Sequence, residues 1–227
     1  MASVEWITFD CYGTLIDWEG GVAQALAPFL PPPVDRRALA AQYIALEAET
    51  EEGAYRPYRE VLAETSGRLM ARLGHPLPSG KGRVLPESLP GWLPFPEVPK
   101  TLRDLRRAGY RLAILSNVDR DLLAASVARL GTAPDLVVTA EDCRSYKPNP
   151  GHWAYFQAHS GASPARTVHV GASLYHDMAP AASCGYRTVF INRRGEPVTG
   201  ARPTRVLPDL GPLPETIADL ARVSGPE

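Results

Sequence analysis

Cysteine is scarce in this sequence, and its placement excludes two classes of small protein. The three cysteines, Cys11, Cys143 and Cys184, are odd in number, lie far apart and form no C-x-x-C pair. Disulfide scaffolds and structural zinc sites need paired or closely spaced cysteines. We therefore expect free thiols and a reducing compartment.

Long apolar segments and excess charge are also missing. The first residues, MASVEWITF, lack the basic region and the apolar stretch of a signal peptide, and no apolar run approaches the roughly 20 residues that cross a bilayer. The net charge is −1, and the arginines are scattered along the chain. We therefore expect a cytoplasmic monomer or homodimer that acts on a small molecule, without a nucleic-acid or membrane partner.

Short apolar strands alternate with helical segments in most of the chain. Strand patterns cover residues 4–9, 111–116, 135–140, 167–173 and 187–192. Helical patterns lie between them, with Gly109 and Gly161 as stop signals and Pro150 as a start signal. This alternation predicts an α/β fold, a Rossmann-like parallel sheet with helices on its faces. The Pro-rich tail after Gly195 is expected to wrap the surface of this core.

A long segment without strand patterning separates the first two predicted strands. It runs from GGVAQALAPFL to YREVLAETSGRLMARLG as Ala- and Glu-rich helices, and then becomes rich in proline and glycine. We predict that residues 18–96 form an all-helical cap domain inserted after the first strand. The catalytic core would then comprise residues 1–17 and 97–227. The Gly and Pro content places hinges near residues 17–20 and 90–99.

Polar residues follow four of the predicted strands in the order acid, Ser-Asn, Lys, acid. These residues are Asp10, Ser116 with Asn117, Lys147 and Asp177. A single acid after a strand is usually a loop residue or a helix cap. Ligands of parallel sheets, however, bind at the carboxyl ends of the strands. Four such groups in succession therefore predict one site at that edge.

The residue types in this predicted site suit covalent catalysis. Asp10 can attack an electrophile and form an ester, and Lys147 can keep that carboxylate ionised and offset charge on a substrate. Thr14, Ser116 and Asn117 are short groups that can orient the nucleophile or the substrate. For Ser116 and Asn117, capping of the following helix is an equally good interpretation.

The motifs together resemble those of the haloacid dehalogenase superfamily of hydrolases. FDCYGTLID is similar to the nucleophile loop, LSNVD to the second motif, SYKPNP to the lysine motif and VGASLYHD to the acidic fourth motif. The helical insertion matches the cap position of one large branch. The resemblance covers essentially the whole chain. It implies catalytic roles for Asp10, Thr14, Lys147 and Asp177 in a core of the superfamily's fold.

Tyr12 discriminates between two activities that the resemblance allows. Superfamily phosphatases place a second Asp two residues after the nucleophile, where it protonates the leaving alcohol. An alkoxide leaves poorly, because its conjugate acid has a pKa near ~15.7, like bulk water. Tyr has a pKa of about 10 and is a poorer acid. Halide leaves without a proton, and Tyr at this position resembles the 2-haloacid dehalogenase branch, which needs no cofactor.

Other positions depart from the dehalogenase pattern. Ala172 and Leu174 stand where well-characterised dehalogenases have Ser and Asn, and Trp153 replaces an expected aromatic hydroxyl. Ser173 and His176 lie in the same loop and can take over the missing roles. His176 can serve as a base, although a His beside an acid is more often a hydrogen-bonded surface residue.

A dehalogenase substrate carries a carboxylate, so the resemblance implies an anionic substrate and a cationic group in the cap. A bidentate Arg clamp suits a carboxylate. The candidates are Arg37, whose spacing before Tyr43 is comparable, and Arg59, with Arg56 as a competitor. The predicted substrate-binding residues are thus Tyr12, Ser116, Asn117, Arg37, Arg59 and Ser173. Trp18 and Trp92 are packing residues that can also line a cleft between cap and core.

Two alternatives remain open at this point. The first is a Mg²⁺-dependent phosphatase, in which Asp10 and Asp177 would be the metal carboxylates, since Ala172 stands where many magnesium-dependent members have an acid. The second is a degenerate member that binds a small anion without turnover. Asp119 is interpreted as a turn or cap residue under all of these hypotheses.

Overall fold

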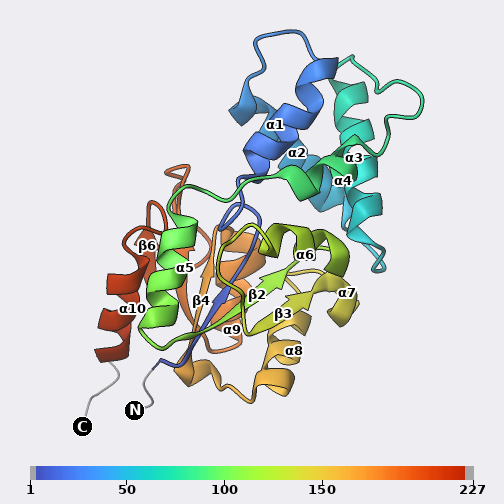
Figure 1. The fold of residues 1–227 in the computed structure, drawn as a ribbon. Coiled ribbons are helices and arrows are strands. Elements are labelled where there is room, and N and C mark those ends of the chain that lie inside the picture. Colours follow the sequence, from blue (N-terminus) through green and yellow to red (C-terminus); the bar gives the residue numbers. More distant parts are fainter. Residues whose placement is uncertain (1–3, 223–227) are drawn as a thin grey trace.

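The computed structural model describes residues 4–222, and its centre is a six-stranded sheet. The order is β3-β2-β1-β4-β5-β6, and every pairing is parallel (Figure 1). The strands are β1 (Trp6–Phe9), β2 (Arg111–Ser116), β3 (Leu136–Thr139), β4 (Thr167–Gly171), β5 (Arg187–Ile191) and β6 (Arg205–Leu207). Phe9 pairs with Ile114 on one side and Val170 on the other. The predicted α/β class is confirmed.

Alternate side chains of the strands pack on opposite faces of the sheet. Ile7 and Phe9 of β1 belong to a large apolar cluster with α5 (Val98–Arg107), α6 (Arg120–Val127) and α10 (Leu213–Arg222). Trp6 belongs to a second cluster with α8 (Gly151–Ser160) and α9 (Ala179–Ser183). A short helix, α7 (Ala140–Cys143), follows β3 directly. Burial on both faces explains why the central strands read as continuous apolar runs.

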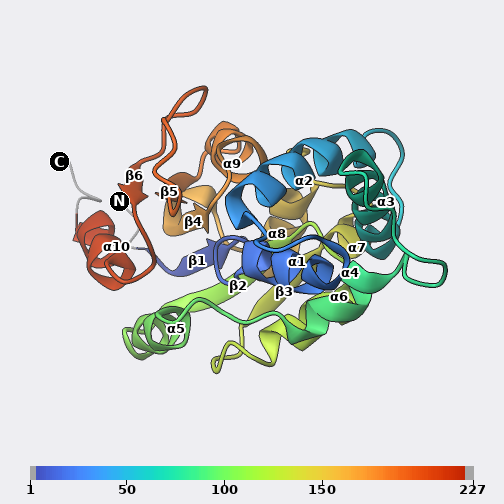
Figure 2. The same cartoon turned by 90° about the horizontal axis from the view of Figure 1, so that it is seen from above.

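The insertion after β1 is helical. It contains α1 (Trp18–Leu26), η1 (Ala27–Phe29), α2 (Arg36–Thr50), α3 (Tyr58–Arg72), α4 (Val84–Ser88) and η2 (Leu89–Gly91). Helices α1 to α4 pack on one another and lie beyond the carboxyl ends of the strands (Figure 1). Seen from above, they cover the side of β2 and β3 and leave β6 and α10 uncovered (Figure 2). The division into domains at residues 17/18 and 96/97 stays a prediction.

The tail departs from the expectation of a surface wrap. It adds the edge strand β6, which pairs with β5, and the helix α10, whose Leu213, Ile217 and Leu220 are buried. The i, i+4, i+7 spacing of these three residues is the signal of an amphipathic helix. Within residues 4–222, no helix is long and apolar enough to cross a membrane.

Candidate active site

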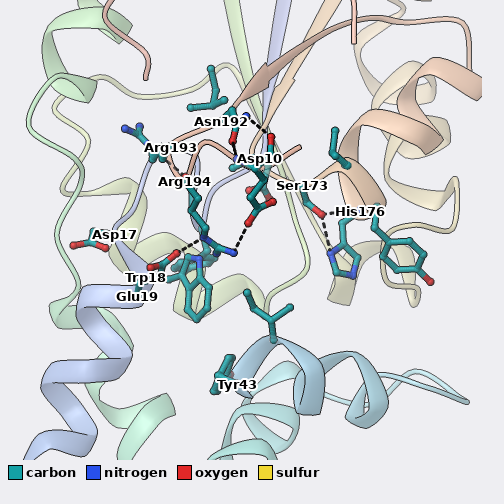
Figure 3. Close-up of a pocket in the computed structure, with 18 of the residues that line it drawn as sticks. Asp10, Asp17, Trp18, Glu19, Tyr43, Ser173, His176, Asn192, Arg193 and Arg194 are labelled. Carbon is teal, nitrogen blue, oxygen red and sulfur yellow. Dashed lines mark hydrogen bonds and ion pairs between the residues drawn. The ribbon is translucent and has the colours of Figure 1, made fainter. Parts of the chain in front are cut away.

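A cleft of about 560 Å³ lies between the helical insertion and the carboxyl ends of the strands. Its walls include Asp10 and His176 from the core side, and Trp18 and Tyr43 from the insertion (Figure 3). Tyr12 also lines the cleft. Both predicted cleft tryptophans, Trp18 and Trp92, line it. The cleft thus lies at the edge of the sheet where polar residues follow the strands.

The turn after β1 fixes the orientation of Asp10. The backbone N–H of Asp10 donates to Val170 O at 2.9 Å, which continues the sheet by one residue. Gly13 has φ +92°, a conformation that L side chains rarely adopt, and the chain turns there. Thr14 Oγ1 then donates to Asp10 Oδ2 at 2.9 Å. One oxygen of the carboxylate is therefore held by its own loop.

Lys147 is buried and uses its ammonium group on three acceptors. Its Nζ donates to Asp10 Oδ1 at 2.8 Å, to Asp177 Oδ1 at 2.7 Å and to Leu115 O at 3.0 Å. Its side chain is 2% exposed. Burial alone would lower the pKa of Lys147, but the two carboxylates outweigh it and raise that pKa. Lys147 is therefore a fixed cation behind Asp10.

Asp177 is committed to contacts inside the protein. Besides Lys147, its Oδ2 accepts the backbone N–H of Ser173 at 3.2 Å, and His169 Nε2 lies 3.6 Å from Oδ1. A Cβ at Gly171 would lie 2.6 Å from the carboxylate, so only glycine fits there. Burial raises the pKa of Asp177, but Lys147 and His169 outweigh it and hold that pKa well below its usual range. Asp177 is thus a weak base.

Asp10 is perturbed in the opposite direction. Burial raises the pKa of Asp10 to about 6, because Lys147 offsets only part of this effect and the Asp177 charge adds to it. At neutral pH Asp10 is mostly ionised. A carboxylate that is ionised but poorly solvated is well suited to attack an electrophile.

Tyr12 turns its hydroxyl away from this cluster. The hydroxyl lies 2.9 Å from Ser126 Oγ on α6, and the ring packs edge-on against Trp92 at 5.9 Å between centroids. Burial raises the pKa of Tyr12 well above its ordinary value. The residue two positions after Asp10 is therefore a wall of the cleft and a very weak acid.

The structure brings together four of the predicted residues and separates others. Asp10, Thr14, Lys147 and Asp177 form one hydrogen-bonded cluster. Of the predicted substrate-binding residues, those that line the cleft are Tyr12, Arg37 and Ser173, whereas Ser116, Asn117 and Arg59 do not. The catalytic and binding roles themselves stay predictions.

The position of Ser116 and Asn117 outside the cleft has a clear physical reason. Ser116 is buried, and its Oγ has no partner within residues 4–222. The Asn117 side chain accepts the backbone N–H of Lys147 at 2.7 Å and donates to Lys147 O at 3.0 Å. The Asn117 side chain therefore holds the lysine loop in place.

Arg59 is held by the core and points away from the cleft. Asp119 accepts its Nε at 3.0 Å and its backbone N–H at 2.9 Å, and it also accepts the backbone N–H of Tyr58 at 2.8 Å. The Nη2 atom of Arg59 forms an ion pair with Asp121. Asp119 was expected to cap or turn its own segment. Instead, it accepts backbone N–H groups from the first turn of α3, about 60 residues earlier in the sequence. This contact links the helical insertion to the core.

The phosphatase alternative implies a bound Mg²⁺, and the residues present do not fit it. Both oxygens of Asp177 are occupied by Lys147 and Ser173, and position 172 is alanine. Within residues 4–222, no group of three or more His, Cys, Asp or Glu side chains is placed to hold a metal ion. A Lys147 cation already lies between Asp10 and Asp177, where a metal would repel it.

Several cleft residues were missed from the sequence. Arg193 and Arg194 follow β5, so the rule that located Asp10 would have located them too. On α2, Tyr43 and Glu47 line the cleft at an i, i+4 spacing, and Glu47 Oε1 accepts the hydroxyls of Tyr43 and Tyr58. That spacing is the only sequence signal for this wall, and it is equally typical of a solvated helix face.

Comparisons with known proteins agree with this geometry. The chain is 33% identical to (S)-2-haloacid dehalogenase 4A from Burkholderia cepacia over 45% of each chain, so it spans less than half of that relative. It is 29% identical to haloacetate dehalogenase H-2 from Moraxella sp. (strain B), over 86% of this chain and 88% of that one. The crystal structure of an L-2-haloacid dehalogenase matches with a TM-score of 0.84 and 26% identity, over 96% of this chain and 100% of the other.

The sequence pattern of the haloacid dehalogenase-like hydrolases matches residues 4–185, which is most of the chain. This region contains the strands from β1 to β4, the helical insertion and all four residues of the Asp10 cluster. The chain belongs to the haloacid dehalogenase-like hydrolases.

Proposed function

We propose that this hydrolase is of the 2-haloacid dehalogenase type. Asp10 attacks the α-carbon of a 2-haloacid, the carbon–halogen bond breaks and halide leaves. Water then hydrolyses the Asp10 ester and releases a 2-hydroxy acid. The relatives named as dehalogenases support this activity, and so does the Asp10 cluster, in which Lys147 and Thr14 hold one oxygen each.

The position of the Tyr12 hydroxyl carries the proposal. General acid help to a leaving alcohol is worth roughly 10²–10⁴ in rate, and it requires a donor near the leaving group. Here the side chain two residues after Asp10 is bound to Ser126 through its hydroxyl, and its pKa is raised by burial. A leaving group that departs as a stable anion suits this site better than an alkoxide does.

Arg37 is the best candidate for binding the substrate carboxylate. Four arginines line the cleft, and Arg36, Arg193 and Arg194 each form an ion pair with a carboxylate. Arg37 has no carboxylate partner within residues 4–222. Its exposed guanidinium can therefore clamp a substrate without breaking an ion pair.

We also propose that the insertion at residues 18–96 moves as a cap to admit that substrate.

The direct test is halide release from a panel of haloacids. We expect chloride or bromide from 2-chloropropionate, 2-bromopropionate or the haloacetates, measured by ion chromatography, with a 2-hydroxy acid formed in equal amount. The rate should be insensitive to chelator. No halide across the panel, together with chelator-sensitive hydrolysis of aryl phosphates, would replace this proposal with the phosphatase alternative.

The pKa of Asp10 sets the pH dependence of that reaction. Burial raises this pKa to about 6, and only the ionised carboxylate attacks. We expect kcat/KM to be low in acid, to rise tenfold per pH unit below about 6 and to level off above it. Halide release across buffers of constant ionic strength measures this. A profile already level near pH 4.5 would mean that Asp10 has an ordinary carboxyl pKa.

A further inference from the structure

Arg193 is a largely buried arginine for which the chemistry above has no role. It lies two residues after β5, in a loop where the backbone N–H of Asn192 donates to Leu207 O of β6 at 2.7 Å. Its side chain is 17% exposed and lines the cleft, but its guanidinium is turned away from Asp10 (Figure 3). A charged group with so little exposure needs partners inside the protein.

The first partners of Arg193 are two successive carbonyl groups in the Asp10 loop, residues 10–17. Its Nε–H donates to Gly13 O at 3.2 Å, and its Nη2 donates to Thr14 O at 2.8 Å. Within residues 4–222, neither carbonyl accepts another hydrogen bond. The parallel N–H groups of a guanidinium fit two neighbouring acceptors, whereas a lysine ammonium has no such fork. Arg193 therefore satisfies the loop backbone on both sides of one peptide bond.

The same guanidinium also contacts the return segment, residues 93–97, through which the chain leaves the insertion. Its Nη2 donates to Glu97 Oε1 at 2.7 Å, and its Cζ lies 3.6 Å from the centroid of the Phe95 ring. The return segment in turn pairs with the Asp10 loop, because the backbone N–H of Phe95 donates to Leu15 O at 3.0 Å. Both connections between the core and the insertion thus meet at Arg193.

Thr14 links these contacts to the carboxylate of Asp10. Its carbonyl accepts from Arg193, and its Oγ1 donates to Asp10 Oδ2 at 2.9 Å. The preceding residue is Gly13, and glycine adopts many backbone conformations with similar ease. The shape of the loop therefore depends on its contacts. A displaced loop would move Thr14 Oγ1 and change the direction in which Asp10 presents its carboxylate.

Substrate binding is a weaker interpretation of Arg193. Its Nε carries one hydrogen and its Nη2 carries two, and the three acceptors at Gly13, Thr14 and Glu97 use all of them. A bidentate clamp on a substrate carboxylate would have to break at least one of these bonds. Arg193 is therefore better placed to hold the protein than to hold a ligand.

We propose that Arg193 is a positioning residue, which fixes the Asp10 loop against the return segment and so sets the direction from which Asp10 attacks. This rests on the proposed function. Arg193 touches no reacting atom and acts through the backbone of Gly13 and Thr14. A displacement of about 1 Å in a catalytic group lowers a rate by as much as about 10²-fold. The effect should fall on bond formation and leave substrate binding unchanged.

The test is the first turnover of an Arg193→Met variant with 2-bromopropionate, followed as bromide release by rapid quench. We expect the maximal rate to fall by about 10²-fold, and the substrate concentration that gives half of this rate to stay the same. Arg222→Met is the matched control. Arg222 forms an ion pair with Asp219 on α10, but its side chain is 77% exposed. The control should behave as the unaltered protein does.

Chemical rescue separates positioning from a general loss of structure. Arg193→Ala leaves room for a guanidinium ion between the Asp10 loop and the return segment. Guanidinium chloride at millimolar, non-denaturing concentration should therefore restore part of the first-turnover rate. Methylammonium has the same charge without the fork and should not restore it. Arg193→Lys should be slowed as Arg193→Met is.

Hydrogen exchange measures the state of the Asp10 loop without any substrate. The backbone N–H groups of Leu15 and Ile16 both donate to Cys11 O, at 2.7 and 2.9 Å, so their protection reports whether the loop keeps its shape. In Arg193→Met, peptides that cover residues 10–17 should exchange faster than in the unaltered protein. Peptides from α8 should exchange at the same rate in both proteins.

Four results would overturn the proposal. The first is an Arg193→Met protein whose first turnover is as fast as that of the unaltered protein. The second is a raised half-saturating substrate concentration at an unchanged maximal rate, which would make Arg193 a substrate ligand. The third is rescue by methylammonium equal to that by guanidinium, which would mean that charge alone matters. The fourth is unchanged hydrogen exchange in the Asp10 loop.

Failure of the proposed function is a separate outcome. If the unaltered protein forms no ester with any haloacid, the 2-haloacid dehalogenase assignment fails. The exchange of residues 10–17 in Arg193→Met then still decides whether Arg193 holds the Asp10 loop.

Discussion

Replacement of Lys147 with methionine is expected to abolish turnover and to lower the free energy of unfolding by about 3–5 kcal/mol. The ammonium group of Lys147 donates to both Asp10 and Asp177, and all three side chains are largely buried. Methionine has similar length but leaves two buried carboxylates facing each other without a cation. Equilibrium urea unfolding near neutral pH measures the loss, with circular dichroism to establish that the variant folds.

The pH dependence of this loss has a definite sign. In the unaltered protein the folded pKa of Asp177 lies below its unfolded value of about 3.9, so its stabilising contribution is present above that pH and is lost in acid. Without Lys147, burial and mutual repulsion raise the folded pKa values of Asp10 and Asp177 above about 3.9. The variant is therefore destabilised at neutral pH, and this destabilisation becomes smaller as the pH falls. The difference in the free energy of unfolding between the unaltered protein and Lys147→Met should therefore decrease in acid.

Lys100→Met is the matched control. Lys100 forms an ion pair with Asp104 on α5, but its side chain is 78% exposed. Exposed pairs of this kind contribute at most about 1 kcal/mol, and the control should leave halide release unchanged. A Lys147→Met protein as stable as the control would mean that the buried carboxylates are protonated in the native state. If the difference in the free energy of unfolding between the unaltered protein and Lys147→Met increased in acid, Asp10 and Asp177 could not be the ionised partners of a charged Lys147.

Residues that follow a strand directly were predictable from the sequence. Asp10 comes directly after an apolar run, and the carboxyl ends of parallel strands meet at one edge, so the order of the elements determines which side chains converge. Position along a strand also decided which face each side chain takes, as for Ile7 and Trp6. The order of the strands and the alternation of side chains along a strand both depend on residues that are close in sequence, so both can be predicted from the sequence.

Contacts between distant elements were not predictable. Arg59 looked like a substrate ligand, yet Asp119, about 60 residues later, binds it and caps its helix. Nothing in the spacing of either residue indicates that pair. Strand β6 was missed for another reason: at three residues, with Arg205 and Val206 exposed, it has no apolar alternation to detect. Its place in the sheet depends on β5 alone.

A second large effect on catalysis is expected at Asp10. Asp10→Asn keeps the shape of the side chain but removes the nucleophilic carboxylate, so turnover should fall by about 10⁶-fold, the loss seen when a nucleophile is removed. Labelling of the unaltered enzyme with ¹⁸O tests the role of Asp10 more directly than the loss of activity does. In water enriched in ¹⁸O, with enzyme in excess over 2-bromopropionate, the Asp10 peptide should gain one ¹⁸O, and the first hydroxy acid released should contain none.

Direct attack of water on the α-carbon gives the opposite pattern, with the label in the product and none in Asp10. Asp35→Asn is the control for substitution itself, because Asp35 caps α2 at an exposed position and asparagine caps helices equally well. It should turn over and label as the unaltered protein does. Label in the product alone would rule out an ester at Asp10. Label in Asp10 but not in the first product would establish that Lys147 and Thr14 hold a carboxylate that forms and releases a covalent bond.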